Sequence, residues 1–194
     1  QAEVQTSAVG VREAALQAAR DLNAHLHLLR PMSRTITVRL QDCGTGSEAV
    51  WLDEAAEILL CDEVLESVSR FGEPTVAVAR FILAHELGHA VADLFDEPAT
   101  GSGELEADEF AAVFLIATGL YGQDIAMAAR LMQSMAEIPD LVPATAAERQ
   151  ARSEALRCLL DGATAAQNTE CGAVFVSARS RWEQRVLIGG PALQ

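Results

Sequence analysis

The sequence predicts an α+β fold in which a small sheet precedes a mostly helical remainder. Apolar and polar residues alternate at 35–40, as in a half-buried strand, and two shorter strand-like runs follow at 49–52 and 57–61. Farther along the chain, apolar residues recur at helical spacing instead. With 194 residues and 50% hydrophobic content, the chain can bury one core, so we expect a single domain over residues 1–194.

Each predicted element has a local reason. The apolar residues of Val11 to Leu29 follow a helical period that ends at Arg30-Pro31. After the three strands, Gly72 closes one helix and Pro74 begins the next. The helices predicted after the sheet lie at 62–71, 75–94, from Glu104 onward, 123–137, 145–160 and 174–187. The domain then has three parts: an N-terminal helix (1–30), the sheet with the two helices that carry the motifs below (31–120), and a helical C-terminal part (121–194).

The helix predicted at 75–94 carries the most informative motif, His85-Glu86-Leu87-Gly88-His89. Residues four apart share one helix face, so both imidazoles can reach a single metal ion. Glu86 lies about a third of a turn away, where it can contact a metal-bound water without binding the metal. The rest of this helix is almost wholly apolar, and burying these three polar side chains would be costly without a partner. The motif therefore predicts a zinc site with His85 and His89 as ligands and Glu86 as the catalytic base.

A tetrahedral catalytic zinc takes three protein ligands and leaves the fourth position to water. One class of site places a third histidine six residues after the second, but that position is Phe95 here. The other class uses a glutamate on a following helix, and Glu104 opens such a helix with Asp108 one turn later on the same face. We expect Glu104 as the third ligand and Asp108 as the acceptor for the other ring N–H of a zinc-bound histidine. Glu106 points to the opposite side, where we expect it to be solvated, but it or Glu109 remains the alternative ligand.

These motifs resemble those of known enzymes. The segment His85 to His89, followed by the Glu104-Leu105-Glu106-Ala107-Asp108 helix, looks like the gluzincin metallopeptidases, whose third zinc ligand is the Glu of an E-x-x-A-D helix. Over residues 30–188, including Asp42-Cys43-Gly44 and Cys171 to Trp182, the chain also resembles a bacterial family of proposed metallopeptidases catalogued as a domain of unknown function. The resemblance implies a zincin-like fold of the small gluzincin type and a hydrolase activity.

From the motif and this resemblance we expect peptide-bond hydrolysis with one Zn²⁺ per chain. A zinc-activated water would attack the amide, and Glu86 would take its proton and return it to the leaving amine. In this fold type an extended peptide substrate lies along an edge strand, for which 57–61 is the nearest candidate in the sequence. The alternatives are a zinc-containing binding module that does not cleave, and a peptidase-like domain restricted to one partner protein. A purely structural zinc has no need of Glu86, which favours catalysis.

Four cysteines bear on the compartment. None forms a C-x-x-C pair or lies near the histidines in sequence, so two disulfides in any of three connectivities are possible. Because each pair brackets one short unit and the family resemblance has cysteines in the same two groups, we expect Cys43 with Cys61 and Cys158 with Cys171. The chain also starts at Gln1 rather than Met, as after removal of a signal peptide or after trimming. These features predict an extracytoplasmic protein, periplasmic or secreted; four buried free thiols in a cytosolic protein are the alternative.

The formal net charge is −14, from 28 acidic and 14 basic residues, and the basic residues are scattered. Phosphate binding needs a basic patch, so nucleic acid is not an expected partner. No apolar run reaches the ~18 residues that a transmembrane helix needs. Oligomeric state cannot be inferred from the sequence. Two groups of arginines are interpreted as solvated helix faces: Arg149, Arg152 and Arg157 on one late helix, and Arg179, Arg181 and Arg185 on another.

Overall fold

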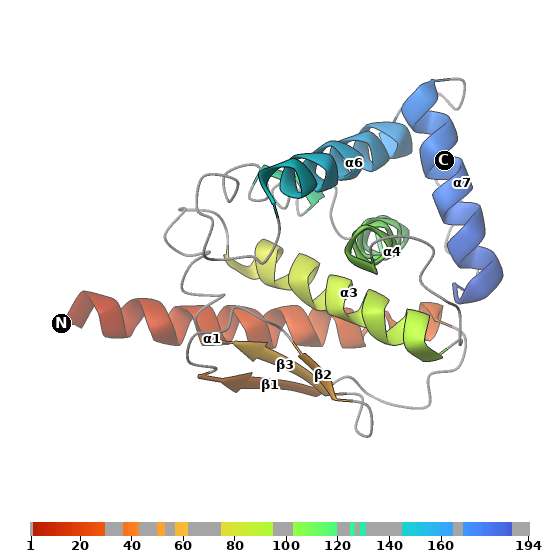
Figure 1. Ribbon diagram of the computed structural model, residues 1–194. Helices are drawn as coiled ribbons and strands as arrows, with labels where there is room; N and C mark the ends of the chain where they lie inside the picture. The colour runs from red at the N-terminus through yellow and green to blue at the C-terminus, as the bar shows by residue number, and fades with distance from the viewer. Residues whose placement is uncertain are drawn as a thin grey trace.

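The computed structural model describes residues 2–29, 37–42, 50–52, 57–61, 75–94, 103–119, 125–126, 129–130, 145–164 and 169–187. These residues form helices α1 (Ala2–Asn23), α3 (Thr75–Leu94), α4 (Gly103–Ala117), α6 (Ala146–Thr164) and α7 (Glu170–Arg185), with a 3-10 turn η1 (Leu26–Leu28). The strands are β1 (Thr37–Gln41), β2 (Val50–Leu52) and β3 (Glu57–Cys61). Figure 1 shows the sheet on one side of α1 and α3, and α4 seen end-on between α3, α6 and α7. The described chain is therefore mostly helical with one small sheet.

The three strands form a mixed sheet in the order β1-β3-β2. β3 runs parallel to β1, with Thr37 opposite Glu57, and antiparallel to β2, with Val50 opposite Leu59. The prediction that 57–61 is an edge strand open to a substrate is wrong, because β3 is hydrogen-bonded on both sides. Periodicity identifies strands but not their order. Among the strands that the structure describes, β1 and β2 form the edges.

Helix α1 lies closer to the N-terminus than the predicted helix at 11–29. It begins before Gly10, because one exposed glycine costs a helix only about 1 kcal/mol and does not stop it. It ends at Asn23, and the chain continues into η1. There the His25 Nδ1 atom is hydrogen-bonded to the carbonyl oxygen of Asp21 at 2.8 Å, which satisfies a carbonyl at the helix end.

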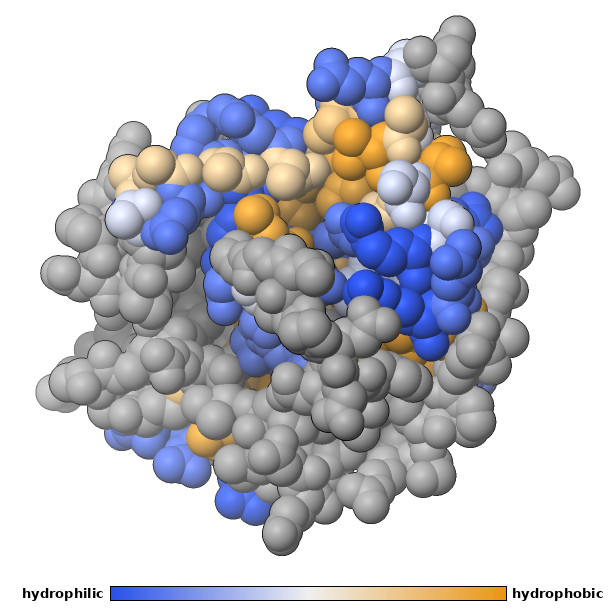
Figure 2. All heavy atoms as spheres, turned by 45° about the vertical axis from the view of Figure 1, so that its right-hand side comes forward, coloured by the Kyte–Doolittle hydropathy of each residue, from blue (hydrophilic) through white to orange (hydrophobic). Residues whose placement is uncertain are grey.

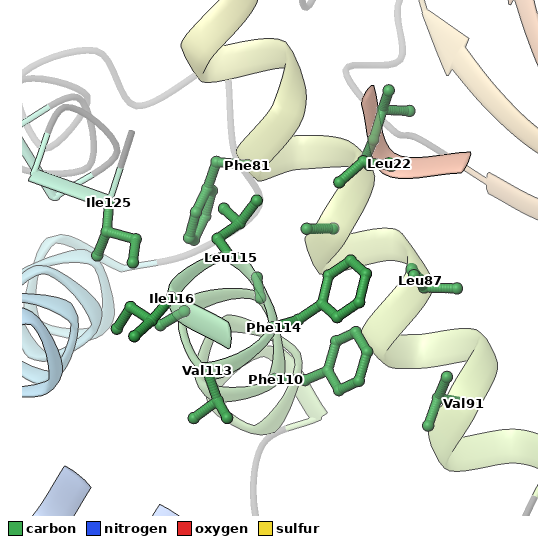
Figure 3. Close-up of a cluster of buried hydrophobic side chains, with 14 of the residues drawn as sticks. Leu22, Phe81, Leu87, Val91, Phe110, Val113, Phe114, Leu115, Ile116 and Ile125 are labelled. Carbon is green, nitrogen blue, oxygen red and sulfur yellow. The ribbon is translucent and has the colours of Figure 1, made fainter. Parts of the chain in front are cut away.

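Helices α3 and α4 pack closely, and this contact joins the two halves of the predicted site. A Cβ atom on Gly88 would lie 3.0 Å from Ala107 Cα and 3.1 Å from the Phe110 ring, so the glycine of the motif allows α4 to approach α3. Figure 3 shows Phe110 and Phe114 pointing from α4 toward α3, on the side where Leu87 lies. Full burial of such a ring contributes roughly 1.5–3 kcal/mol. The close approach of the two helices at Gly88 and Ala107 therefore lies within the turns that carry the predicted ligands.

Side-chain caps set the starts of α6 and α7. At the start of α6, the Thr145 hydroxyl accepts a hydrogen bond from the Glu148 N–H, and the Glu148 carboxylate accepts one from the Thr145 N–H. At the start of α7, the Thr169 side chain accepts a hydrogen bond from the Gly172 N–H at 3.0 Å. This cap explains why α7 begins at Glu170, before the predicted 174–187.

The predicted disulfide Cys158–Cys171 is present and joins α6 to α7. Cys61 is also disulfide-bonded. Its predicted partner Cys43 lies outside the described residues, so the Cys43–Cys61 pairing stays a prediction.

Two predicted helices fall largely outside the described residues. The predicted helix at 62–71 lies wholly outside, and within 123–137 only 125–126 and 129–130 are described, all of them helical. In the part of the chain that the structure describes, no helix combines the length and the apolar character needed to cross a membrane.

Reduction of the protein is expected to lower its melting temperature. The Cys158–Cys171 bridge spans a sequence separation of 13 residues, and the chain-entropy model gives about 3 kcal/mol for a loop of that size. Thermal unfolding with and without a reducing agent measures this contribution, and peptide mapping of unreduced protein from an oxidising compartment checks both pairings. An unchanged melting temperature would show that the bridge adds no stability, and four free thiols would overturn the pairing.

Candidate metal centre

Two neighbouring helices supply the predicted site residues: α3 carries His85 and His89, and α4 carries Glu104 and Asp108. The four-residue spacing places each pair on one face of its helix. The two imidazole rings meet edge to face, with centroids 4.7 Å apart and Nε2 atoms 3.1 Å apart. Both Nε2 atoms therefore approach the same point.

Glu104 approaches this point from α4. Its Oε2 atom lies 3.3 Å from His85 Nε2, and its Oε1 atom lies 3.4 Å from His89 Nε2. A tetrahedral zinc with bonds of about 2.0–2.1 Å separates its ligand atoms by roughly 3.3–3.4 Å. Among the described residues, His85, His89 and Glu104 form a group able to hold a metal ion. Two imidazole nitrogens and one carboxylate group, with one oxygen near each nitrogen, match the donor set of a catalytic zinc.

Glu106 and Glu109, the two alternative metal ligands on α4, are both paired with side chains of helix α7. Glu106 is paired with Arg185 at 3.0 Å and is partly buried, so the expectation that it is solvated is wrong. Glu109 accepts hydrogen bonds from Arg181 Nη2 at 2.6 Å and from Trp182 Nε1 at 2.9 Å. Figure 2, with this side of the molecule turned forward, shows hydrophilic residues in a compact patch beside a group of apolar ones. Arg181 and Arg185 therefore connect α7 to α4 through ion pairs, in addition to facing solvent.

Asp108 orients one imidazole. Its Oδ1 atom lies 2.8 Å from His85 Nδ1, and Asp108 is 1% exposed. A carboxylate in this position favours the tautomer that presents Nε2 to a metal. Burial alone would raise the pKa of Asp108, but hydrogen bonds from His85 and Arg152 outweigh it and hold that pKa below its usual value. Burial alone would lower the pKa of His85, but hydrogen bonds to Asp108 and Glu104 raise it to about 9.

Arg152 of α6 is buried against this cluster, so the prediction that it belongs to a solvated face is wrong. Its exposed fraction is 5%. Its Nε atom donates to Asp108 Oδ2 at 2.6 Å, and its Nη2 atom donates to Asp108 Oδ1 at 2.9 Å. Its Nη1 atom lies 3.0 Å from Glu104 Oε2. One guanidinium group thus contacts two of the predicted site carboxylates.

The sequence carries a signal for the burial of Arg152 in the apolar spacing of α6. Arg149 and Arg152 are spaced three apart and continue, at helical spacing, into Leu156 and Leu159 on the same buried stripe of α6. Arg149 is likewise buried, which also contradicts the prediction, whereas Arg157 lies off the stripe and is exposed as predicted. An arginine on an apolar stripe has to find a carboxylate inside the protein.

Two carboxylates near the histidines differ in their ionisation. Glu86 is 9% exposed, and burial raises its pKa to about 7 although the nearby His85 and His89 favour its charged form. Glu104 is half exposed, and hydrogen bonds from both histidines hold its pKa well below its usual range. Glu104 therefore stays ionised, as a metal ligand must. Glu86 is suited to gain and lose a proton near neutral pH, as a catalytic base must.

A family model described as "Putative metallopeptidase" matches residues 7–170 of this chain. The matched segment contains the His85 to His89 motif and both acidic residues of α4 that face it. No curated protein and no solved structure matches the chain. The match covers well over half of the sequence, so the chain belongs to this metallopeptidase family, in agreement with the resemblance carried by its motifs.

Proposed function

We propose that the chain is a zinc-dependent peptidase of zincin-like fold that hydrolyses peptide bonds. The observation that carries the proposal is the approach of His85, His89 and Glu104 to within 3.1–3.4 Å of one another, beside the buried Glu86. Family membership supports the general class of metallopeptidase. Three protein ligands suit a catalytic zinc, since a structural zinc takes four.

Each residue then has a defined role. His85, His89 and Glu104 would hold the zinc, and Asp108 keeps His85 in the orientation that presents Nε2. When bound, zinc lowers the pKa of a water from about 15.7 to about 7 and polarises the substrate carbonyl. Glu86 takes one proton from the attacking water and delivers it to the nitrogen of the leaving amine as the C–N bond breaks. Glu86 thereby returns to its starting state.

The substrate is proposed to lie along β2. An extended peptide adds to a sheet at an edge strand. β2 is an edge strand that contacts α3, the helix with the histidines, whereas the other edge strand, β1, contacts α1. Because β2 spans three residues, Val50–Leu52, it would hold only a short stretch of peptide backbone.

An extracytoplasmic location is part of the proposal. The Cys158–Cys171 bridge and the bonded state of Cys61 support it, since disulfides persist in oxidising compartments. Either a periplasmic or a secreted protein fits this chemistry.

Purified protein is expected to hold one zinc per chain, and native mass spectrometry under zinc-replete conditions measures this. His85→Ala and His89→Ala should each lose the metal, because two ligands are too few for a stable site. A peptide library then tests hydrolysis: cleavage should stop with a chelator and return with zinc. As a control, His27→Ala removes an exposed imidazole whose Nδ1 atom is hydrogen-bonded to the backbone carbonyl of Ala24, and it should leave zinc content unchanged.

Wild-type protein without metal would refute the zinc site. Protein that binds zinc and cleaves no peptide in the library would favour the alternative of a zinc-containing binding module.

A further inference from the structure

Arg152 lies at the junction of three helices of the candidate metal centre. It comes from α6, whereas its two partners, Glu104 and Asp108, come from α4, and both partners face the histidines of α3. Arg152 lies 44 residues from Asp108 in the sequence. The link between α6 and the site therefore depends on tertiary packing, in which α6 is joined to α7 by the Cys158–Cys171 disulfide.

Each guanidinium nitrogen of Arg152 contacts a different carboxylate oxygen. Nε and Nη2 bind the two oxygens of Asp108 side by side, an arrangement that fixes the plane of the guanidinium group. With that plane fixed, Nη1 is directed at Glu104 Oε2, 3.0 Å away. Asp108 is almost fully buried, so the anchored end cannot swing out to solvent. A lysine, with a single ammonium group, cannot hold both carboxylates in this way.

Glu104 depends on a fixed partner such as Arg152 more than the other predicted ligands do. It lies in the first turn of α4, and 53% of its side chain is exposed, compared with 9% for His85 and 30% for His89. An exposed glutamate samples several rotamers, and a metal that binds it must first order the side chain.

We propose that Arg152 is a positioning residue for the metal ligand Glu104: anchored on Asp108, it holds the Glu104 carboxylate in place for the metal. The inference rests on the proposed zinc site and adds to it. Arg152 does not bind the metal. It lowers the cost of ordering the most exposed of the three predicted ligands.

The test compares zinc affinity in wild type, Arg152→Lys and Arg157→Lys, by competition with a chromophoric chelator. Arg157→Lys is the matched control, because it makes the same change at an exposed position of the same helix. Arg152→Lys keeps the positive charge but removes the planar guanidinium group that contacts Asp108 and Glu104 together. It is expected to weaken zinc binding about 10- to 100-fold. Circular dichroism of metal-free protein reports whether each variant is folded, so that affinity is compared between folded proteins.

A double-mutant cycle with Glu104→Gln separates positioning from general support of the fold. If Arg152 acts through Glu104, adding Arg152→Lys to Glu104→Gln should weaken zinc binding further by less than about 3-fold. The visible spectrum of bound Co²⁺ should change in Arg152→Lys and stay unchanged in Arg157→Lys, because it reports ligand geometry. A full 10- to 100-fold additional loss in the double variant would overturn the proposal, since Arg152 would then act without Glu104.

The remaining outcomes are also decisive. Equal zinc affinity in wild type and Arg152→Lys overturns this inference and leaves the proposed function intact, whereas a wild type that binds no zinc refutes both. If Arg152→Lys does not fold, a crystal structure of zinc-loaded wild type decides. Arg152 Nη1 within about 3.5 Å of the Glu104 carboxylate supports the proposal, and a Glu104 turned away from Arg152 refutes it.

Discussion

Glu86→Gln is expected to slow peptide cleavage by about 10²- to 10⁴-fold while zinc content and fold stay unchanged. The amide has nearly the size and shape of the carboxylate but cannot accept a proton at neutral pH. Glu86 is buried next to His85 and His89, and its carboxylate is suited to exchange a proton near neutral pH. Its replacement therefore removes the proton transfer and keeps the three predicted ligands.

The rate is measured on a peptide identified from the library, with zinc quantified in the same sample. Glu154→Gln provides the matched control: it makes the same change at an exposed position of α6, where Glu154 accepts a hydrogen bond from Gln150. This control should cleave at the wild-type rate. If Glu86→Gln cleaves as fast as wild type with the same zinc content, another group moves the proton and the role assigned to Glu86 is wrong.

The part of the candidate site that the sequence predicts best is the part with local spacing. His85 and His89 are one helical turn apart, as are Glu104 and Asp108, so helix geometry alone places each pair on one face. Gly88 adds to this, because its missing side chain lets the two helices approach each other. Within the described residues, the predicted hydrogen bond between a histidine ring N–H and Asp108 is present at His85 and follows from that approach.

The contacts of Arg152 with the site and the position of β3 in the sheet were not predicted. Arg152 reaches Asp108 across 44 residues, and an arginine on a helix is usually solvated, so charge alone gave the wrong interpretation. The central position of β3 was missed for a related reason: the short apolar run at 57–61 indicates a strand but not which strands flank it. Helix α7 starts early because of Thr169, a single capping side chain that apolar periodicity does not register. The order of the strands, the partners of a buried arginine and the caps of helices depend on tertiary or short-range polar contacts rather than on hydrophobic spacing.

Gly162→Ala is expected to destabilise the protein by about 4 kcal/mol, which lowers the melting temperature of a chain of this size by about 10 °C. A Cβ atom on Gly162 would overlap the carbonyl oxygen of Cys171 and lie 2.7 Å from its carbonyl carbon and 2.8 Å from Phe175 Cβ. Two of these three atoms belong to the backbone of α7 and cannot rotate away. The helices would have to separate beside the Cys158–Cys171 bridge, which resists that movement.

Gly10→Ala is the matched control for this substitution. Among the described residues, nothing lies within 4 Å of a Cβ atom on Gly10, which is itself exposed in helix α1. Alanine there should therefore stabilise the protein by up to about 1 kcal/mol through its higher helix propensity. Opposite signs for the same substitution would show that close helix packing, rather than propensity, decides the effect at Gly162. Thermal or urea unfolding of the two variants measures both values. A Gly162→Ala protein as stable as wild type would mean that α6 and α7 are not as close as the structure has them, and the packing of Arg152 against the metal centre would need to be determined again.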